Sequence, residues 1–179
     1  MASYPSIYRL GHAAVDDLLR GPVLVEEKID GSQFSMGLDS DGNLYMRSKG
    51  QQIFPDHPEK MFSAAVETAL SLTGSMHPGL TYRCEYLRSP KHNVLAYDRI
   101  PTHHLIVFDI DDGGERYLPP ERKRNAAAEL GLECVPVLYE GVFDIDWLKM
   151  LLQTTSVLGG QTIEGLVIKP LNYDVFGKD

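Results

Sequence analysis

Apolar residues that alternate with polar ones, or that form short runs between turn residues, predict most of the β-strands of this chain. Alternation with a period of two and enrichment in Val, Ile, Tyr and Phe are typical of strands. A hairpin is expected over Gln33–Ser48, because Asp39-Ser40-Asp41-Gly42 separates two such segments and is typical of a turn. The other expected strands are Val23–Ile29, Leu80–Leu87, His104–Ile110, Val135–Tyr139 and Gly165–Lys169, the last of them stopped by Pro170.

Three further segments have the spacing of amphipathic helices. The apolar residues of Pro58–Leu72 recur at helical intervals, which indicates one buried face. A second helix is expected from Pro119-Pro120 to Leu130, where Gly131 ends it, and a third over Asp144–Gln153. Hairpins combined with separated helices favour an α+β fold with mostly antiparallel sheets.

Length and composition narrow the class of protein. The chain has 179 residues, 43% hydrophobic and 23% charged, which predicts one compact globular domain over residues 1–179. No apolar run approaches the roughly 20 residues of a membrane helix, and the start does not resemble a secretory signal. Cys84 and Cys134 are therefore expected to be reduced thiols of a cytoplasmic protein. The net charge of -8 argues against nucleic-acid binding by bulk charge. Binding of a polyanion would then need a local basic patch, or a part that is missing from this chain.

The segment Glu27-Lys28-Ile29-Asp30-Gly31-Ser32 carries the most specific candidate chemistry. A lysine at the end of a strand, beside a tight turn, is able to project into a pocket and act as a nucleophile once its amine is neutral. The adjacent glycine allows a phosphate to approach the backbone. A surface lysine in an ordinary turn is the alternative interpretation.

A second segment, Glu164-Gly165-Leu166-Val167-Ile168-Lys169, places a carboxylate before a short apolar strand that ends in a lysine. Glu164 is suited to a hard metal ion and Lys169 to a phosphate. A buried strand with charged ends would have the same pattern.

Three shorter features lie between these segments. Arg47-Ser48-Lys49-Gly50 offers two cations to phosphates, or is a solvated turn. Glu85 lies in the middle of a strand, where a carboxylate without a partner is costly, so it binds a ligand, pairs with Arg83 or Arg88, or faces water. Phe108 provides an aromatic ring that either stacks on a base or packs in the core.

The five segments, in this order, resemble motifs I, Ia, III, IIIa and IV of the covalent nucleotidyltransferases, which comprise polynucleotide ligases and mRNA capping enzymes. The chain is most similar to the phage-type RNA ligase 2 family, which includes the RNA-editing ligases. This similarity rests on Glu27–Ser32, on Glu85-Tyr86-Leu87 with Lys91-His92-Asn93 and Tyr97, on Phe108-Asp109-Ile110, and on the opening Tyr4-Pro5-Ser6-Ile7.

The resemblance implies an ATP-dependent RNA ligase whose nucleotide lies between antiparallel sheets flanked by helices. Lys28 would attack the α-phosphate of ATP and form lysyl-AMP. AMP would pass to an RNA 5′-phosphate, and a 3′-hydroxyl would then displace AMP and join the strands. Such an enzyme needs Mg²⁺ or Mn²⁺ and acts in RNA repair. We expect a monomer that contacts no membrane.

The resemblance also assigns the other site residues by position. Glu27 would accept the adenine amino group, Phe108 would stack on adenine, and Glu85 would hold the ribose hydroxyl. Glu164 would bind the metal ion. The remaining contacts to the nucleotide and its phosphates are assigned to Ile29, Gln33, Arg47 and Lys169.

One motif of the family has no counterpart. Motif V is a Lys-x-Lys about 20 residues after the motif IV glutamate, whereas here Lys178 lies too early and has no partner lysine. We expect the C-terminal RNA-binding domain of the family to be missing as well. We therefore expect a truncated or minimal adenylyltransferase core that binds ATP, adenylylates Lys28 slowly or not at all, and seals no nicks unaided.

Other functions remain open at this point. The motifs do not fix the base or the acceptor, so a DNA ligase or a GTP-using capping enzyme is one alternative. A non-catalytic nucleotide- or RNA-binding module is another, favoured by the missing motif V and opposed by the presence of Lys28, Glu85 and Glu164.

Overall fold

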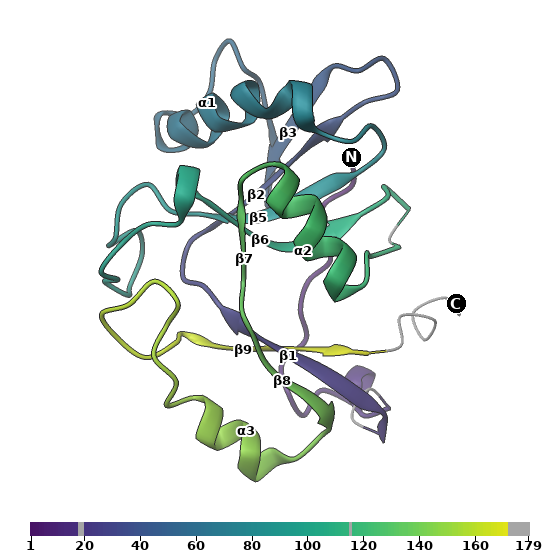
Figure 1. The fold of residues 1–179 in the computed structure, drawn as a ribbon, viewed down its shortest axis with the longest axis vertical. Coiled ribbons are helices and arrows are strands. Elements are labelled where there is room, and N and C mark those ends of the chain that lie inside the picture. The colour runs from purple at the N-terminus through teal and green to yellow at the C-terminus, as the bar shows by residue number, and fades with distance from the viewer. Residues whose placement is uncertain (18–19, 115, 172–179) are drawn as a thin grey trace. The chain divides into compact units, whose positions relative to one another are not determined.

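The computed structural model describes residues 1–17, 20–114 and 116–171, and these form two compact units (Figure 1). The large unit comprises Met1–Tyr4 and Asp30–Cys134. The small unit comprises Pro5–Ile29 and, within the described residues, 135–171. The chain crosses from the small unit to the large one inside the segment that contains Lys28 and Asp30.

The large unit is built on a six-stranded sheet in the order β4-β3-β2-β5-β6-β7. Neighbouring strands are antiparallel except β6 and β7, which are parallel. Its helices are α1 (Ser63–Leu72) and α2 (Pro120–Glu129), with short 3-10 turns at Lys60–Phe62, Thr73–Ser75 and Thr102–His104. The strands are β2 (Ser32–Leu38), β3 (Leu44–Ser48), β4 (Gln52–Ile53), β5 (Thr81–Tyr86), β6 (Leu105–Asp111) and β7 (Glu133–Cys134).

One face of this sheet forms the main hydrophobic core. Successive side chains of a strand point to opposite faces, so alternate residues of each strand share a face. The core face packs against α1 through Ala65, Val66 and Ala69. Its buried strand residues include Phe34, Met36, Met46, Tyr82, Cys84, Tyr86, Leu105, Val107 and Ile110. The intervening residues, many of them polar, occupy the opposite face, which we call the polar face.

The small unit has a three-stranded antiparallel sheet in the order β8-β1-β9, formed by β1 (Pro22–Lys28), β8 (Val137–Val142) and β9 (Gly165–Pro170). A 3-10 turn covers Ala13–Val15. Helix α3 (Ile145–Leu151) is capped by Asp144, whose carboxylate accepts a hydrogen bond from the Asp146 backbone N–H at 2.9 Å. Leu148 of this helix packs on Val23 and Val25 of β1.

The α+β class predicted from the sequence is confirmed, and most predicted strands and helices are present. The helix expected over Pro58–Leu72 was predicted too long, because the segment makes a 3-10 turn before α1 begins. Met61 and Leu70, which belong to the apolar spacing, are in fact exposed. The strand expected over Val135–Tyr139 is shifted toward the C-terminus, because Val137 to Val142 are the residues that pair with β1.

Candidate active site

Lys28 and Glu164 are in direct contact within the small unit. Lys28 is the last residue of β1 and lies opposite Gly165, the first residue of β9. Its Nζ donates a hydrogen bond to Oε1 of Glu164 at 2.6 Å, and the two side chains are 47% and 31% exposed. The predicted nucleophile and the predicted metal ligand, 136 residues apart in the sequence, therefore share one accessible site.

A buried ion pair lies on the same face of this sheet. The register places Glu26 opposite Val167 and Leu24 opposite Lys169, so these residues share the face of Lys28. Lys169 Nζ is 2.7 Å from Glu26 Oε2, and both side chains are more than 90% buried. Lys169, predicted to contact the nucleotide, thus has an anionic partner within its own sheet.

Glu27 lies on the opposite face of β1. Its carboxylate accepts hydrogen bonds from the Ser156 hydroxyl and, at 3.0 Å, from the Val157 backbone N–H. Burial raises the pKa of the Glu27 carboxyl, and these two hydrogen bonds oppose the rise. Glu27 thereby anchors the loop that precedes Glu164, while its predicted contact with adenine stays a prediction. Ile29, predicted to line the nucleotide site, is buried.

The turn after Lys28 is fixed by a loop of the large unit. The Asp30 carboxylate accepts hydrogen bonds from the backbone N–H groups of Val94 and Leu95 at 2.8 and 2.7 Å, and from Asn93 Nδ2 at 3.2 Å. Asn93 Nδ2 also donates to the Gly31 carbonyl at 2.7 Å. A Cβ at Gly31 would lie 2.7 Å from the Tyr86 carbonyl oxygen, so this close approach requires glycine.

Gln33, Glu85 and Arg47 lie together on the polar face of the large sheet. Gln33 of β2 is directly opposite Glu85 of β5, and Arg47 of β3 is opposite Ser35 of β2. Among the described residues, the buried Nε2 of Gln33 has no hydrogen-bond partner. A buried amide N–H without an acceptor is costly, so this atom is suited to donate to a bound ligand.

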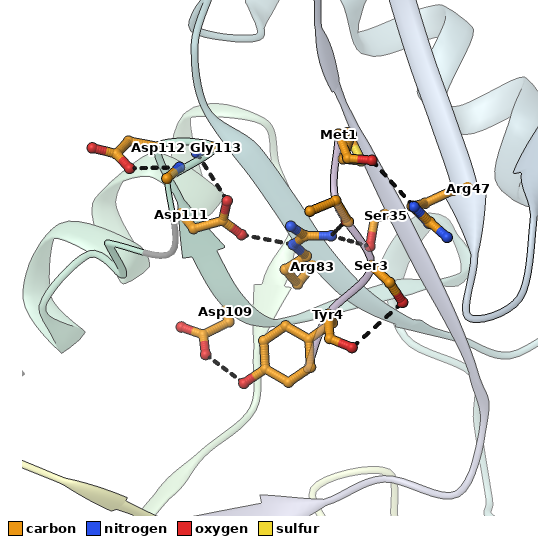
Figure 2. A network of polar contacts seen from close by, with 12 residues as sticks. Met1, Ser3, Tyr4, Ser35, Arg47, Arg83, Asp109, Asp111, Asp112 and Gly113 are labelled. Carbon is orange, nitrogen blue, oxygen red and sulfur yellow. Dashed lines mark hydrogen bonds and ion pairs between the residues drawn. The ribbon is translucent and has the colours of Figure 1, made fainter. Parts of the chain in front are cut away.

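The first residues of the chain cross the same polar face (Figure 2). Arg47 donates to the Met1 carbonyl at 3.1 Å, and Arg83 donates to the Ala2 carbonyl at 2.9 Å. Arg83 also forms a buried ion pair with Asp111, with 2.6 Å between the two side chains. On the polar face, two arginines therefore donate to the main chain of the first residues, and one of them also pairs with a buried carboxylate.

Phe108 is only half-buried, whereas the other six residues of β6 are buried. Its ring meets the Tyr4 ring edge-on, with the centroids 5.0 Å apart and the planes at 84°. The Tyr4 hydroxyl donates to Asp109 Oδ2 at 2.9 Å (Figure 2). Phe108 is thus held at the polar face and outside the main core, as a stacking residue requires.

The predicted site residues fall into two sets. Lys28 and Glu164 meet in the small unit, which also contains Glu27, Ile29 and Lys169. The set in the large unit consists of Gln33, Arg47, Glu85 and Phe108. Three structural partners were not predicted from the sequence: Glu26, Asp111 and Asn93. The available signal for Glu26 was its position directly after the apolar run of Val23 to Val25, and the resemblance had marked Asn93 without giving it a role.

Glu164 offers its carboxylate to a metal ion beside Lys28. The described residues contain no cluster of three or more His, Cys, Asp or Glu side chains that would hold a metal on their own. Mg²⁺ is commonly bound by one or two carboxylates together with substrate phosphates, and the partly exposed Glu164 fits that pattern.

The family model for RNA ligase matches residues 21–178. The chain belongs to the RNA ligase family. This match extends over parts of both compact units. Lys178, the lysine that was compared with motif V, lies outside the residues that the structure describes. No curated protein matches the chain significantly.

Solved RNA ligase structures share the fold. Naegleria gruberi RNA ligase with PPi superposes with a TM-score of 0.67 at 17% identity, over 93% of this chain and 50% of that one. A variant of the same ligase with ATP and Mn gives a TM-score of 0.66 at 16% identity, over 95% and 53%. The chain thus spans about half the length of these ligases. In the described part of this RNA ligase family member, no helix is long and apolar enough to cross a membrane.

Proposed function

We propose that this chain is the adenylyltransferase part of an ATP-dependent RNA ligase, with Lys28 as the residue that becomes adenylylated. The observation that carries the proposal is the contact between Lys28 and Glu164. An amine and a carboxylate that meet at an accessible site, in a chain of the RNA ligase family, are the groups that nucleotidyl transfer requires.

The proposed step is an in-line displacement at the α-phosphate of ATP. Lys28 Nζ forms a bond to the α-phosphorus while the bond from that phosphorus to the bridging oxygen breaks, and pyrophosphate leaves with the electron pair. The amine must lose its excess protons to solvent, because only its neutral form is a nucleophile. Glu164 would exchange the ammonium group for a divalent cation, which favours that neutral form. When bound, Mg²⁺ or Mn²⁺ would neutralise charge on the phosphates.

The polar face of the large sheet supplies the groups proposed to bind the nucleotide. Phe108 offers a ring for the adenine base, and Glu85 accepts from a ribose hydroxyl. Gln33 Nε2 needs an acceptor, and a phosphate oxygen would satisfy it. Arg47 would exchange the Met1 carbonyl for a phosphate, a stronger, charge-assisted hydrogen bond.

The acceptor in the proposed reaction is RNA. AMP moves from Lys28 to a 5′-phosphate, and a 3′-hydroxyl then displaces AMP and forms the phosphodiester bond. ATP, a divalent metal and RNA are inferred here from the family and from relatives whose solved structures hold ATP and Mn.

The test is incubation with α-³²P-labelled ATP and MgCl₂, followed by denaturation. We expect acid-labile label to accumulate slowly on the protein, because no counterpart of motif V was found in the sequence, and we expect none on Lys28→Ala. Lys149→Ala is a matched control, because Lys149 is an exposed lysine that also pairs with a carboxylate, that of Asp146. Its labelling should equal that of the natural sequence.

Two results would contradict the proposal. Label that persists on Lys28→Ala would identify another nucleophile. ATP binding without any label on the natural sequence, at all Mg²⁺ and Mn²⁺ concentrations, would instead identify a non-catalytic nucleotide-binding module.

A further inference from the structure

We infer that Lys123 is a positioning residue that holds Phe108 in place as the platform for the base. This inference rests on the proposed function, since it assumes that Phe108 stacks on the nucleotide. Lys123 lies on α2, is 2% exposed, and donates a hydrogen bond from Nζ to the Phe108 carbonyl oxygen at 3.0 Å. Lysine is almost never fully buried unless its amine is paired, so this contact stabilises the buried side chain.

The carbonyl that Lys123 contacts belongs to a β-bulge. Along β5 and β6, Arg83 pairs with Asp109 and Cys84 pairs with Val107, so Phe108 is the extra residue between two successive pairs. A bulge takes one residue out of the regular ladder and changes the direction of its side chain. Between the core residues Val107 and Ile110, the bulge leaves two successive residues, Phe108 and Asp109, outside the core, and of these Phe108 is the one that is half-exposed.

On the edge of β6 that pairs with β7, the pairing also ends just before Phe108. The parallel strand β7 pairs with Ile106 and Val107. Phe108 follows these residues, and the amine of Lys123 supplies a donor to its carbonyl. A buried carbonyl needs a donor, and here a side chain of α2 supplies one beyond the last β7 pair.

The ring itself is held from the polar face. Tyr4 contacts it edge-on and is fixed by its hydrogen bond to Asp109, the residue after the bulge. Lys123 fixes the main chain of Phe108 and Tyr4 restrains the ring. Replacing Lys123 should therefore let the bulge relax and turn the ring away from the base, without removing any group that contacts the phosphates.

The experiment measures lysyl-adenylate formation as a function of ATP concentration for Lys123→Met. Methionine keeps the length and fills the volume but donates no hydrogen bond. We expect the KM for ATP to rise roughly 5- to 20-fold, within the loss that follows removal of an aromatic stacking partner. The maximal labelling rate should change less than about 3-fold, since the lost interaction acts on binding and not on the reacting atoms.

Several variants make the result specific. Arg124→Met, on the exposed neighbouring position of α2, should leave the KM unchanged. Lys123→Arg keeps a buried cation but not the geometry of the ammonium group, and should raise the KM about 2- to 5-fold with a Tm close to that of the natural sequence. In a Phe108→Leu background, Lys123→Met should add nothing to the KM, because the ring it positions is gone.

The outcomes separate this inference from the proposed function. If the natural sequence takes up no label, the proposed function fails, and the same variants are then compared by their Kd for ATP. If it takes up label but either Lys123 variant that folds keeps the original KM, or if the effects of Lys123→Met and Phe108→Leu are additive, the positioning role is overturned.

Discussion

At the scale of single residues, the pair formed by Glu26 and Lys169 places two charges inside the small unit. Removing charges from water costs free energy that their attraction only partly returns, so such a pair contributes little as a pair. Removing one partner is different, because the remaining charge stays buried beside an apolar neighbour such as Leu24 or Val167.

Lys169→Met is therefore predicted to destabilise the protein by about 3–5 kcal/mol, the usual result when a buried ion pair loses one member. Urea unfolding measures this. The double variant Glu26→Gln with Lys169→Met should recover much of the lost stability, because no charge remains buried. Lys149→Met, at an exposed lysine, should be close to neutral.

The same double variant tests the nucleotide role of Lys169. If a stable double variant also recovers lysyl-adenylate formation, Lys169 acts only within the fold. If it is stable but binds ATP more weakly, Lys169 also contacts the nucleotide. A Lys169→Met variant as stable as the natural sequence would show that the buried pair is not formed in solution.

At the scale of elements, the loop between β5 and β6 holds the turn between β1 and β2 in place. His92 belongs to this contact, because its Nδ1 accepts from the Arg88 backbone N–H at 3.0 Å. In the neutral ring the proton is then on Nε2, which donates to the Ser32 hydroxyl at 2.9 Å. Burial lowers the pKa of His92; Asp30 opposes this shift, and Arg88 adds to it.

This shift predicts that stability falls when the solution is acidified. Above about pH 6.5, the ordinary pKa of histidine, His92 is neutral in both states and its contribution is complete. As the pH falls below that value, the unfolded state takes up a proton first, and stability is lost until the pH has passed the lower pKa of the folded state.

The measurement is urea unfolding between pH 5 and pH 8 for the natural sequence and for His92→Gln. Glutamine offers an acceptor and a donor but does not titrate in this range. The natural sequence should lose more stability than the variant over the acidic half of the range. If the free energy of unfolding depends on pH in the same way for both proteins, protonation of His92 does not affect stability in this range.

Most helices and strands could be predicted from the sequence. The features that could not be predicted lack a local sequence pattern. Strands such as β2 and β3 follow from alternation and a strong turn, which are local signals. The two-residue strands β4 and β7 are too short to produce a pattern and exist only through their partners. Strand β1 is buried on both faces, so its sequence gives no alternation from which to tell that Glu26 and Glu27 point in opposite directions.

Candidate site residues could be proposed from the sequence, but their contacts could not. Lys28 and Glu164 were identified from short motifs, whereas their contact depends on pairing between strands that are far apart in the chain. The same is true of Lys123 and Phe108, which meet only because a bulge in β6 faces α2. Contacts between segments that are far apart in the chain produce no pattern within a short stretch of sequence.

At the scale of the whole molecule, net charge limits how the proposed RNA substrate is bound. The chain has 17 basic and 25 acidic residues. RNA binding gains most of its non-specific affinity from cations that displace counterions at phosphates, and a net charge of -8 opposes that gain. ATP binding depends less on net charge, because a few positioned groups neutralise one small ligand.

We therefore predict that this chain forms lysyl-adenylate but binds RNA only weakly. Residues 1–179 should bind a nicked RNA duplex with a 5′-phosphate only weakly, with a Kd above about 10 µM at physiological salt. The slope of log K against log salt concentration should be shallower than about -3, since each neutralised phosphate of a duplex contributes about -0.9 and few cations are available. Fluorescence anisotropy between 50 and 300 mM NaCl measures both quantities. Submicromolar binding with a steep slope would contradict the prediction, because it would require a basic surface strong enough to outweigh the net charge.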